Sequence, residues 1–294
     1  MSIFHGLSAF PLTPADAEGR VGAGALSRLV QRLVQAKVDS VGLLGSTGTY
    51  AYLSRAERRR AVEAAAECTR GRTPLVVGIG ALRTDAAQLL ARDAEAAGAD
   101  GLLLAPVSYT PLTEDEVFAH VAAVAGATGL PLCLYNNPAT TNFTMTDALV
   151  ARLAALPRVA AVKNPAPPSD EAARHAALRA RVPEDFAIGY SGDWRAGAAL
   201  LAGGQAWYSV IGGLLPEPCL ALTRAALAGE AAQVAALDAR FAPLWALFQE
   251  WSSLRVTHAA ARILGLCDTA LPLPIQPLPP SLRPRIEAAL DALA

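Results

Sequence analysis

Lysine is scarce in this chain, because only Lys37 and Lys163 among its 25 basic side chains are lysines. Arginine stays protonated and cannot act as an amine nucleophile, whereas a desolvated lysine can lose its proton and attack a carbonyl. The scarcity therefore restricts amine chemistry to two positions. Lys37 lies in a polar helix-end setting, but Lys163 lies inside the apolar run 159–165. The other interpretation of Lys163 is a strand-end lysine that extends to solvent.

Cysteine is also sparse. The four cysteines, at positions 68, 133, 219 and 267, lie far apart in mainly apolar settings and form no C-x-x-C pair. This spacing disfavours both a zinc site and a disulfide framework. We therefore predict a protein of the reducing cytoplasm.

An excess of charge of one sign is missing as well, since the formal net charge is −1 and the arginines are scattered. Neither a nucleic acid nor an anionic membrane is expected as a partner. The one cluster, Arg58-Arg59-Arg60, follows Glu57 in a helical pattern and is interpreted as a solvated helix face.

The chain also lacks a signal peptide pattern, because residues 1–6 contain no basic region followed by an apolar run. No export is expected. Two long uncharged stretches, 121–146 and 196–216, are interrupted by glycines, and the first also by prolines. This punctuation is typical of helix, turn and buried strand instead of a membrane span.

What the chain does contain is an alternation of short apolar runs and amphipathic segments. The apolar runs predict eight buried parallel strands, at 6–10, 40–44, 75–79, 101–106, 132–135, 160–163, 187–190 and 207–210. Helices are predicted between them, at 24–36, 55–69, 84–97, 114–126, 145–155, 170–180 and 194–202. Capping boxes are predicted at Ser54-x-x-Glu57 and Thr113-x-x-Glu116, and C-terminal stops at Gly98 and Gly129.

The loops 98–101 and 203–206 each join a helix to an apolar strand, so they behave as equivalent connections of a repeated unit. Repetition favours a (β/α)₈ TIM barrel over an open doubly wound sheet. The absence of G-x-G-x-x-G after the first strand disfavours a dinucleotide-binding domain. We expect two regions: an α/β catalytic barrel at 1–213, and a C-terminal helical extension at 214–294 that serves as packing or as an oligomer surface.

In such a barrel the active site gathers at the carboxyl ends of the strands. Polar residues follow several predicted strands there, namely Gly45-Ser46-Thr47-Gly48, Ser108-Tyr109, Tyr135-Asn136, Lys163 and Ser191-Gly192-Asp193. We therefore expect Lys163 to face hydroxyl groups and not carboxylates.

These residues suit imine chemistry. Burial without a carboxylate partner disfavours the ammonium form of Lys163, so some neutral amine is expected near neutral pH to attack a keto group. A tyrosine hydroxyl can carry the protons that imine formation requires, which fits Tyr135 with Ser46 as the relay. The glycines around Ser46 and Thr47 would let their N–H groups and hydroxyls bind a carboxylate.

Each feature has a structural alternative. A Gly-Ser-Thr-Gly loop is a common turn, and a strand-terminal tyrosine such as Tyr135 is often an amphipathic rim residue. Asp193 is expected to cap the following helix. The joint placement of these residues at the ends of different strands favours the functional interpretation.

At these residues the chain resembles the pyruvate-dependent class I aldolases, the superfamily of dihydrodipicolinate synthase and N-acetylneuraminate lyase. The resemblance covers nearly the whole length. It is carried by Ala9-Phe10-Pro11-Leu12-Thr13-Pro14, Gly45-Ser46-Thr47-Gly48, Leu53-Ser54-Arg55-Ala56-Glu57-Arg58, Tyr135-Asn136-Asn137-Pro138, Val162-Lys163, Ser191-Gly192-Asp193 and Tyr208-Ser209-Val210.

The resemblance implies a barrel with a helical extension, assembled as a tetramer or dimer, in which Lys163 forms a Schiff base with pyruvate or another 2-oxo acid. It also assigns roles to six further residues: Tyr135 as proton donor and acceptor, Ser46 as relay, Thr47, Tyr208 and Gly192 as substrate-binding residues, and Tyr109 as the nearest match to a tyrosine that enters the neighbouring subunit's site. Imine formation supplies the electron sink, so neither a metal nor a cofactor is expected.

Two departures from the family bear on the acceptor. Synthases of the lysine pathway place an arginine shortly after the Tyr-Asn-x-Pro motif, where this chain has Ala139-Thr140-Thr141. A neutral threonine cannot form the bidentate pair that a guanidinium gives to a carboxylate. The glutamate that usually follows the Gly-x-Thr-Gly loop is Thr49.

We therefore expect a lyase or aldolase that acts on a 2-oxo acid and an aldehyde or sugar acid, and that is not a true lysine-pathway synthase. Two alternatives stay open: the 4-hydroxy-tetrahydrodipicolinate synthase of that pathway, and a non-catalytic barrel that binds a 2-oxo acid or sugar acid.

Overall fold

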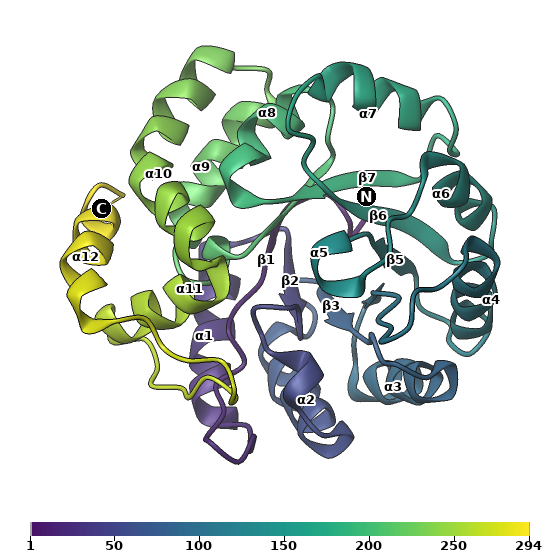
Figure 1. Ribbon diagram of the computed structural model, residues 1–294, viewed down its shortest axis with the longest axis horizontal. Coiled ribbons are helices and arrows are strands. Elements are labelled where there is room, and N and C mark those ends of the chain that lie inside the picture. Colours follow the sequence, from purple (N-terminus) through teal and green to yellow (C-terminus); the bar gives the residue numbers. More distant parts are fainter. Residues whose placement is uncertain (1, 294) are drawn as a thin grey trace.

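The computed structural model describes residues 2–293 and shows a closed barrel of parallel strands ringed by helices (Figure 1). Its eight strands follow one another in chain order, and β8 pairs with β1 to close the barrel. The strands are β1 Gly6–Ala9, β2 Ser40–Leu43, β3 Leu75–Gly78, β4 Gly101–Leu104, β5 Leu132–Tyr135, β6 Val159–Pro165, β7 Ala187–Ser191 and β8 Ala206–Ser209. The TIM-barrel prediction is confirmed.

Helices alternate with the strands on the outside of the barrel. They are α1 Ala23–Ala36, α2 Arg55–Thr69, α3 Thr84–Ala97, α4 Glu114–Ala125, α5 Pro138–Thr141, α6 Asp147–Ala154, α7 Glu171–Arg179 and α8 Ala196–Leu201. The chain then continues in α9 Pro216–Leu227, α10 Ala231–Trp251, α11 Ser253–Ile263 and α12 Arg283–Asp291, which lie together on the left in Figure 1. Short 3₁₀ helices are η1 Tyr50–Tyr52, η2 Asp193–Arg195, η3 Ile211–Gly213 and η4 Pro280–Leu282.

Several helix ends differ from their sequence signals. Thr113 forms the complete capping box. Ser54 accepts from the N–H of Glu57, but the Glu57 carboxylate accepts from the N–H of Val21, 2.6 Å away, so that box is only half formed.

The two predicted C-terminal helix stops have different outcomes. Gly98 ends α3 in the left-handed region, as predicted, with φ +97°. The stop at Gly129 is wrong, because α4 already ends at Ala125 and Gly126 follows it. The four-residue helix α5 was not expected, since a single turn carries no apolar periodicity.

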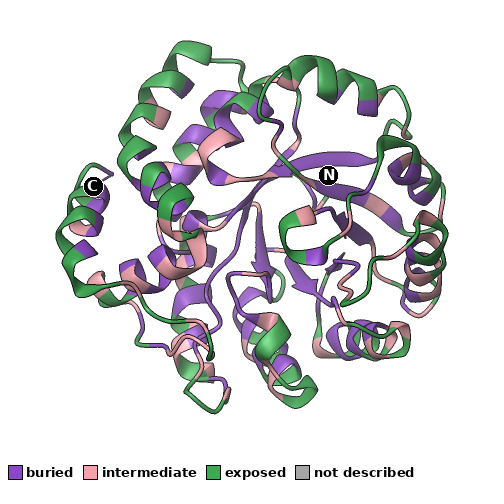
Figure 2. Cartoon of the chain, viewed as in Figure 1, coloured by how far each residue is buried: buried purple, intermediate pink, exposed green. Residues whose placement is uncertain are grey.

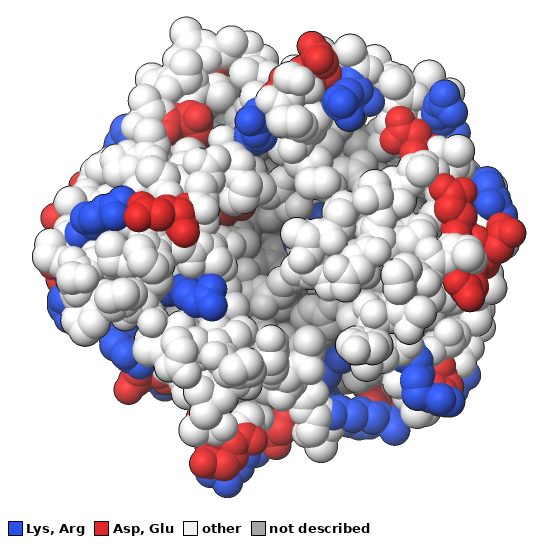
Figure 3. All heavy atoms as spheres, viewed as in Figure 1, with Lys and Arg blue, Asp and Glu red and all other residues white. Residues whose placement is uncertain are grey.

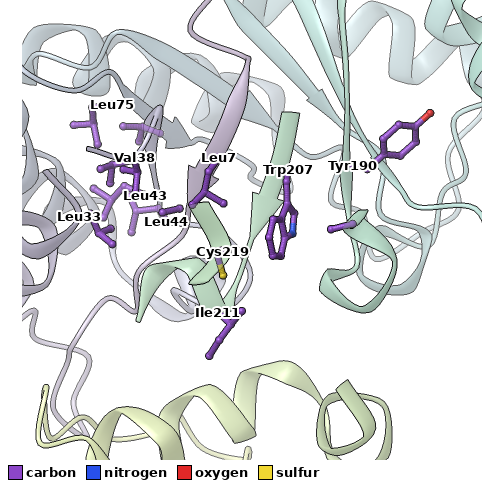
Figure 4. Packing of buried hydrophobic residues seen from close by; sticks show 14 of the residues in the cluster. Leu7, Leu33, Val38, Leu43, Leu44, Leu75, Tyr190, Trp207, Ile211 and Cys219 are labelled. Carbon is purple, nitrogen blue, oxygen red and sulfur yellow. The ribbon is translucent and has the colours of Figure 1, made fainter. Parts of the chain in front are cut away.

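Side chains alternate between two cores along each strand, as the pleat requires. On β5, Cys133 and Tyr135 point into the barrel, whereas Leu134 points toward the helices. The strands are buried and the outer helix faces exposed (Figure 2). Figure 4 shows part of the outer core, including Trp207 of β8 and Cys219 of α9.

Glycines make room for aromatic rings inside the barrel. A Cβ on Gly42 would lie 2.2 Å from the ring of Phe10, and one on Gly189 would lie 2.5 Å from the ring of Tyr208. Phe10 and Tyr208 then meet edge to face, with ring centroids 6.2 Å apart. These rings form an apolar floor near the carboxyl ends of the strands.

The arginine cluster on α2 is not uniformly solvated. Arg59 and Arg60 are exposed, but Arg58 is 6% exposed. Its guanidinium donates to the carbonyl oxygens of Gly78 and Gly80, at 2.8 and 3.0 Å. The interpretation of Arg58 as a solvated residue is therefore wrong, because this position of α2 faces the end of β3.

The cysteines and the helices bear on the compositional predictions. All four cysteines are free and buried. Among residues 2–293, no helix combines the length and hydropathy that crossing a bilayer requires. Over the same residues, no three side chains of His, Cys, Asp or Glu gather as potential metal ligands.

Candidate active site

A cavity of about 680 Å³ opens at the carboxyl ends of the strands. Figure 3 shows a hollow at the centre of this face, with mainly uncharged walls. The cavity brings together six of the seven predicted site residues, namely Ser46, Thr47, Tyr135, Lys163, Gly192 and Tyr208. The C-terminal extension completes its wall with Phe248, Ser252, Ser253, Leu254 and Ile275.

Lys163 is buried, with 4% of its surface exposed, and its amine rests on aromatic rings. Nζ lies 4.1 Å from the ring centre of Tyr135, 4.3 Å from that of Phe10 and 5.5 Å from that of Tyr208. None of the ion pairs among residues 2–293 includes Lys163. The side chain therefore does not extend to solvent, and its amine faces the cavity.

Tyr135 lies beside Lys163 because the two are register partners on β5 and β6. Its hydroxyl lies 3.4 Å from Oγ of Ser46 and accepts a hydrogen bond of 2.9 Å from Nδ2 of Asn137. The Asn137 bond occupies one lone pair and leaves the hydroxyl proton free to be donated toward Ser46 or a ligand. Tyr135 and Ser46 thus form a hydroxyl pair at the amine.

The loop after β2 presents unused donors. Within residues 2–293, the backbone N–H groups of Ser46 and Thr47 donate no hydrogen bond, and neither does the Thr47 hydroxyl. The loop is bracketed by Leu44 and Thr49, whose φ angles of +57° and +54° lie in the left-handed region. Such conformations cost energy in residues other than glycine and cluster at ligand sites. The donors can receive a carboxylate.

The glycines of this loop serve close packing. A Cβ on Gly45 would lie 2.6 Å from Phe10, and one on Gly48 would lie 2.8 Å from Oγ1 of Thr13. Neither glycine has a positive φ. Their small size lets the loop descend onto the aromatic floor.

Asp193 does not cap the following helix, contrary to its sequence signal. Its carboxylate accepts from Nε1 of Trp207 (3.0 Å), from Oγ of Ser209 (3.3 Å), and from the N–H groups of Val210 and Ile211. The carboxyl is buried, which raises its pKa, although these donors act in the opposite direction. Asp193 therefore fastens the end of β8, and its charge interacts with Lys163 at longer range.

Gly192 and Tyr208 hold the cavity wall in different ways. Gly192 has φ +91°, a conformation that suits glycine, and it lines the cavity just before η2. The Tyr208 hydroxyl lies 3.3 Å from Sγ of Cys133 in the barrel interior. Burial raises the pKa of Tyr208 well above its ordinary value, so this phenol stays protonated.

Tyr109 is not brought to the cavity of its own chain. Its side chain is 94% exposed in the loop before α4, and it does not line the cavity. A role at the active site would require a second copy of the chain.

Several lining residues were given no role in the sequence prediction. Tyr50 and Asn137 line the cavity, as does Arg195, whose Nη1 donates to the carbonyl of Pro168 at 2.6 Å. Within residues 2–293, Nε and Nη2 of Arg195 donate no hydrogen bond. The polar run after Tyr135 could have indicated Asn137. Arg195 gave no such signal, since its distance from Thr140 in the sequence conceals that both line one cavity.

Comparison with known proteins agrees with this geometry. The model of the Dihydrodipicolinate synthetase family matches residues 3–293. A 4-hydroxy-tetrahydrodipicolinate synthase from Acidiphilium cryptum is 32% identical over 292 residues and covers 99% of each chain. One from Methylococcus capsulatus is 33% identical over 280 residues, covering 95% of this chain and 94% of its own.

Solved structures are also similar. The crystal structure of a dihydrodipicolinate synthase from Agrobacterium tumefaciens is 60% identical, with a TM-score of 0.98 and 99% of each chain covered. A chloride-inhibited dihydrodipicolinate synthase from Acinetobacter baumannii, crystallised with pyruvate, is 27% identical, with a TM-score of 0.91 and the same coverage. The full-length family match and these relatives establish that the chain belongs to the dihydrodipicolinate synthetase family.

Proposed function

We propose that this protein forms a Schiff base between Lys163 and pyruvate, or a related 2-oxo acid, and then makes or breaks a bond to an acceptor other than the lysine-pathway aldehyde. Family membership supports the predicted pyruvate-dependent lyase class. The observation that carries the proposal is the buried amine of Lys163, which shares one cavity with the Tyr135 hydroxyl and the unused donors of Ser46 and Thr47.

Binding comes first in this scheme. The carboxylate of the 2-oxo acid occupies the N–H groups of Ser46 and Thr47, which places its keto carbon toward Lys163. The pyruvate complex of the Acinetobacter baumannii relative supports this choice of 2-oxo acid. The rings of Phe10, Tyr135 and Tyr208 surround the amine and leave it facing the cavity in which the 2-oxo acid binds.

Chemistry then requires proton movement. The amine adds to the keto carbon to give a carbinolamine, whose hydroxyl takes up one proton and leaves as water, so that an iminium remains on Lys163. Loss of a proton from the adjacent carbon gives the enamine. Tyr135 is placed to donate and accept these protons, with Ser46 as its partner 3.4 Å away.

The acceptor is constrained by the part of the cavity wall that α5 and Arg195 form. Ala139 and Thr140 of α5 line the cavity and carry no charge. Arg195 lines it from the β7–α8 connection, where its Nη1 lies 3.6 Å from Oε1 of Glu171. A polyhydroxylated acid whose distal end meets Arg195 and the serines at the α10–α11 junction fits this arrangement better than an aldehyde held at Thr140.

The lysine-pathway synthase is the second candidate. It is favoured by the name that the curated relatives carry at 32–33% identity over nearly their whole length. In that case Arg195 would bind the carboxylate of the aldehyde from a different direction.

Trapping tests the proposal. Incubation with pyruvate followed by borohydride should place a reduced pyruvyl adduct on Lys163, identified by peptide mass spectrometry. If well-folded protein gives no adduct with any 2-oxo acid, the imine proposal is wrong.

A substrate panel then separates the candidates. Aspartate semialdehyde is compared with 2-keto-3-deoxy sugar acids, and strong turnover of the semialdehyde would favour the lysine-pathway synthase. A Lys163→Ala variant that binds ligand as well as the wild type, in a protein without turnover across the panel, would indicate a non-catalytic barrel.

We further infer that the protein works in the cytoplasm as a homo-oligomer, on small-molecule substrates and without a metal or organic cofactor. The exposed Tyr109 supports the assembly, since a large aromatic side chain at 94% exposure is suited to burial against a second copy. Tyr109→Ser is expected to shift the sedimentation profile toward smaller species.

A further inference from the structure

The hydroxyl of Tyr135 receives a hydrogen bond from a residue outside the barrel strands. The donor is Nδ2 of Asn137, which lies 2.9 Å from the phenol oxygen, where the chain leaves β5 and enters α5. On another side of the phenol oxygen, Oγ of Ser46 lies 3.4 Å away. Tyr135 is thus held between the start of α5 and the loop after β2.

The backbone of Asn137 is anchored at the start of α5. Asn137 is the N-cap residue of this helix, and its carbonyl oxygen accepts from the N–H groups of Thr140 and Thr141, each at 3.0 Å. The same oxygen accepts from Oγ1 of Thr141, also at 3.0 Å, and Thr141 is 1% exposed. The carboxamide of Asn137 therefore extends from a fixed backbone.

The carboxamide itself has one partner. Within residues 2–293, Oδ1 of Asn137 accepts no hydrogen bond, and Nδ2 donates only to Tyr135. An asparagine at a helix N-cap commonly accepts from a backbone N–H of the first turn, but the side chain of Asn137 makes no such bond. It contacts the phenol instead and lines the active-site cavity.

The preceding asparagine has a different role. Asn136 is 7% exposed, its Oδ1 accepts from the N–H of Met145 at 3.1 Å, and its Nδ2 donates to Oδ1 of Asn164 at 3.0 Å. These bonds tie β5 to β6 and to the segment before α6, and Asn136 does not line the cavity. Of the two adjacent asparagines, the first holds the fold together and the second contacts the phenol.

A donor at the phenol oxygen determines where the phenol proton points. A tyrosine hydroxyl has one proton and acceptor lone pairs, whereas an amide nitrogen can only donate. Nδ2 of Asn137 therefore occupies a lone pair, and the proton of Tyr135 turns away from α5, toward Ser46 or a ligand on Lys163. A group that only accepts, in the same place, would draw the proton toward α5.

We propose that Asn137 is a positioning residue that directs the proton of Tyr135 toward the adduct on Lys163. The proposal rests on the proposed imine chemistry, and Asn137 acts through Tyr135 without touching the reacting carbon. Because Asn137 also begins α5, whose Thr140 lines the cavity, it joins the wall proposed to meet the acceptor to the hydroxyl proposed to transfer the proton.

Exchange of the pyruvate methyl protons with D₂O tests this proposal without knowledge of the acceptor. The methyl carbon loses one proton when the enamine forms and takes up one deuteron when the enamine returns to the iminium, and proton NMR gives the rate. In Asn137→Leu, which lacks the donor, we expect the maximal rate to fall about three- to ten-fold. In Asn137→Asp, which has the same shape but only accepts, it should fall about thirty-fold.

The loss should appear in the rate and not in binding. The proposed contacts of pyruvate are Ser46, Thr47 and Lys163, so KM for pyruvate should stay within about two-fold of wild type in both variants. The borohydride adduct on Lys163 after long incubation should equal that of wild type.

Acid provides a signature that a structural role would not give. Below its pKa, the carboxyl of Asn137→Asp carries a proton and can donate to the phenol oxygen as the carboxamide does. For an unperturbed carboxyl pKa of about 3.9, the rate of this variant relative to wild type should rise about three-fold from pH 8 to pH 5. The ratio for Asn137→Leu should stay flat.

The ratio also removes the pH dependence that wild type and variant share. Both proteins keep every other titratable group that lines the cavity, and each variant is compared with wild type at the same pH. Besides Tyr135, these groups are Tyr50, Tyr52, Lys163, Asp193, Arg195 and Tyr208.

Asn142→Asp is the matched control. It makes the same change directly after α5, on an exposed side chain that does not line the cavity, and it should exchange within about two-fold of wild type. An equal loss in Asn142→Asp overturns the positioning role. Wild-type exchange in Asn137→Asp also overturns it, and so does a ratio for that variant that is independent of pH.

The adduct separates failure of this proposal from failure of the imine chemistry. A wild type that gives no borohydride adduct overturns the imine chemistry, and the positioning role with it. A wild type that forms the adduct on Lys163 and exchanges the methyl protons, beside Asn137 variants that exchange equally fast, overturns the positioning role alone.

Discussion

The amine of Lys163 lies 4.1 Å from the ring centre of Tyr135, its register partner on the neighbouring strand. Parallel pairing places both side chains on the inner face of the barrel, at the same height. The same register puts the nucleophile within reach of the hydroxyl that is proposed to protonate its adducts. The chemistry of the site therefore depends on the pairing of β5 with β6.

Substitution of the nucleophile tests its identity. Lys163→Arg keeps a positive charge in the cavity but cannot form an imine, so turnover should fall by at least about a thousand-fold and borohydride should leave no adduct. Lys37→Arg, at the end of α1, is the matched control and should behave as wild type. An adduct that persists in Lys163→Arg would assign the imine to another residue.

Removal of the Tyr135 hydroxyl tests proton transfer. Tyr135→Phe keeps the ring beside Nζ, so we expect pyruvate binding to persist while kcat falls about 10²- to 10⁴-fold. Tyr190→Phe is the control, because Tyr190 is buried and bonded to His175 but does not line the cavity. Equal losses of kcat in the two variants would indicate damage to the fold instead of lost acid–base chemistry.

Addition of a cation at α5 tests the acceptor. Thr140→Arg places a guanidinium where the lysine-pathway synthases carry one, and it should raise kcat/KM for aspartate semialdehyde by about ten-fold or more, since a charge-assisted pair is worth roughly 1.5–3 kcal/mol. Thr140→Gln has similar bulk without charge and should give no gain. A wild type that already prefers the semialdehyde would contradict the assignment.

Acid should destabilise the protein through His258. Burial lowers the pKa of this histidine from 6.5 to about 4, with the Thr47 backbone opposing the shift. Between these values the unfolded chain binds a proton that the folded chain does not, so stability falls as pH decreases from about 6.5 to 4.

The size of this effect can be measured by urea unfolding. At pH 5, His258 should account for a loss of about 2 kcal/mol relative to neutral pH. His258→Asn should remove most of that dependence, whereas the same change at the exposed His5 should retain it. If His258→Asn lost stability between pH 7 and 5 as the wild type does, another group would be responsible.

Much of the fold is encoded locally. The eight strands and most helices were predictable because apolar runs bounded by glycine and helical periodicity are properties of short segments. The half-formed box at Ser54 and the position of Asp193 were not, because in both cases a distant backbone N–H competes for the carboxylate. A cap signal is local, but the acceptor that satisfies it is chosen among all groups within reach.

The candidate site likewise combines features that the local sequence encodes with features that depend on the tertiary structure. The sequence by itself determined that amine chemistry had two candidate positions, that one lay in a buried strand, and that hydroxyls ended the strands around it. Only the tertiary structure decided that Arg58 is buried, that Arg195 lines the same cavity as Thr140, and that Tyr50 reaches the ends of β3 and β4. The physical reason is that closure of the barrel brings together segments that are remote in the chain, and no local pattern records which side chains then share a cavity.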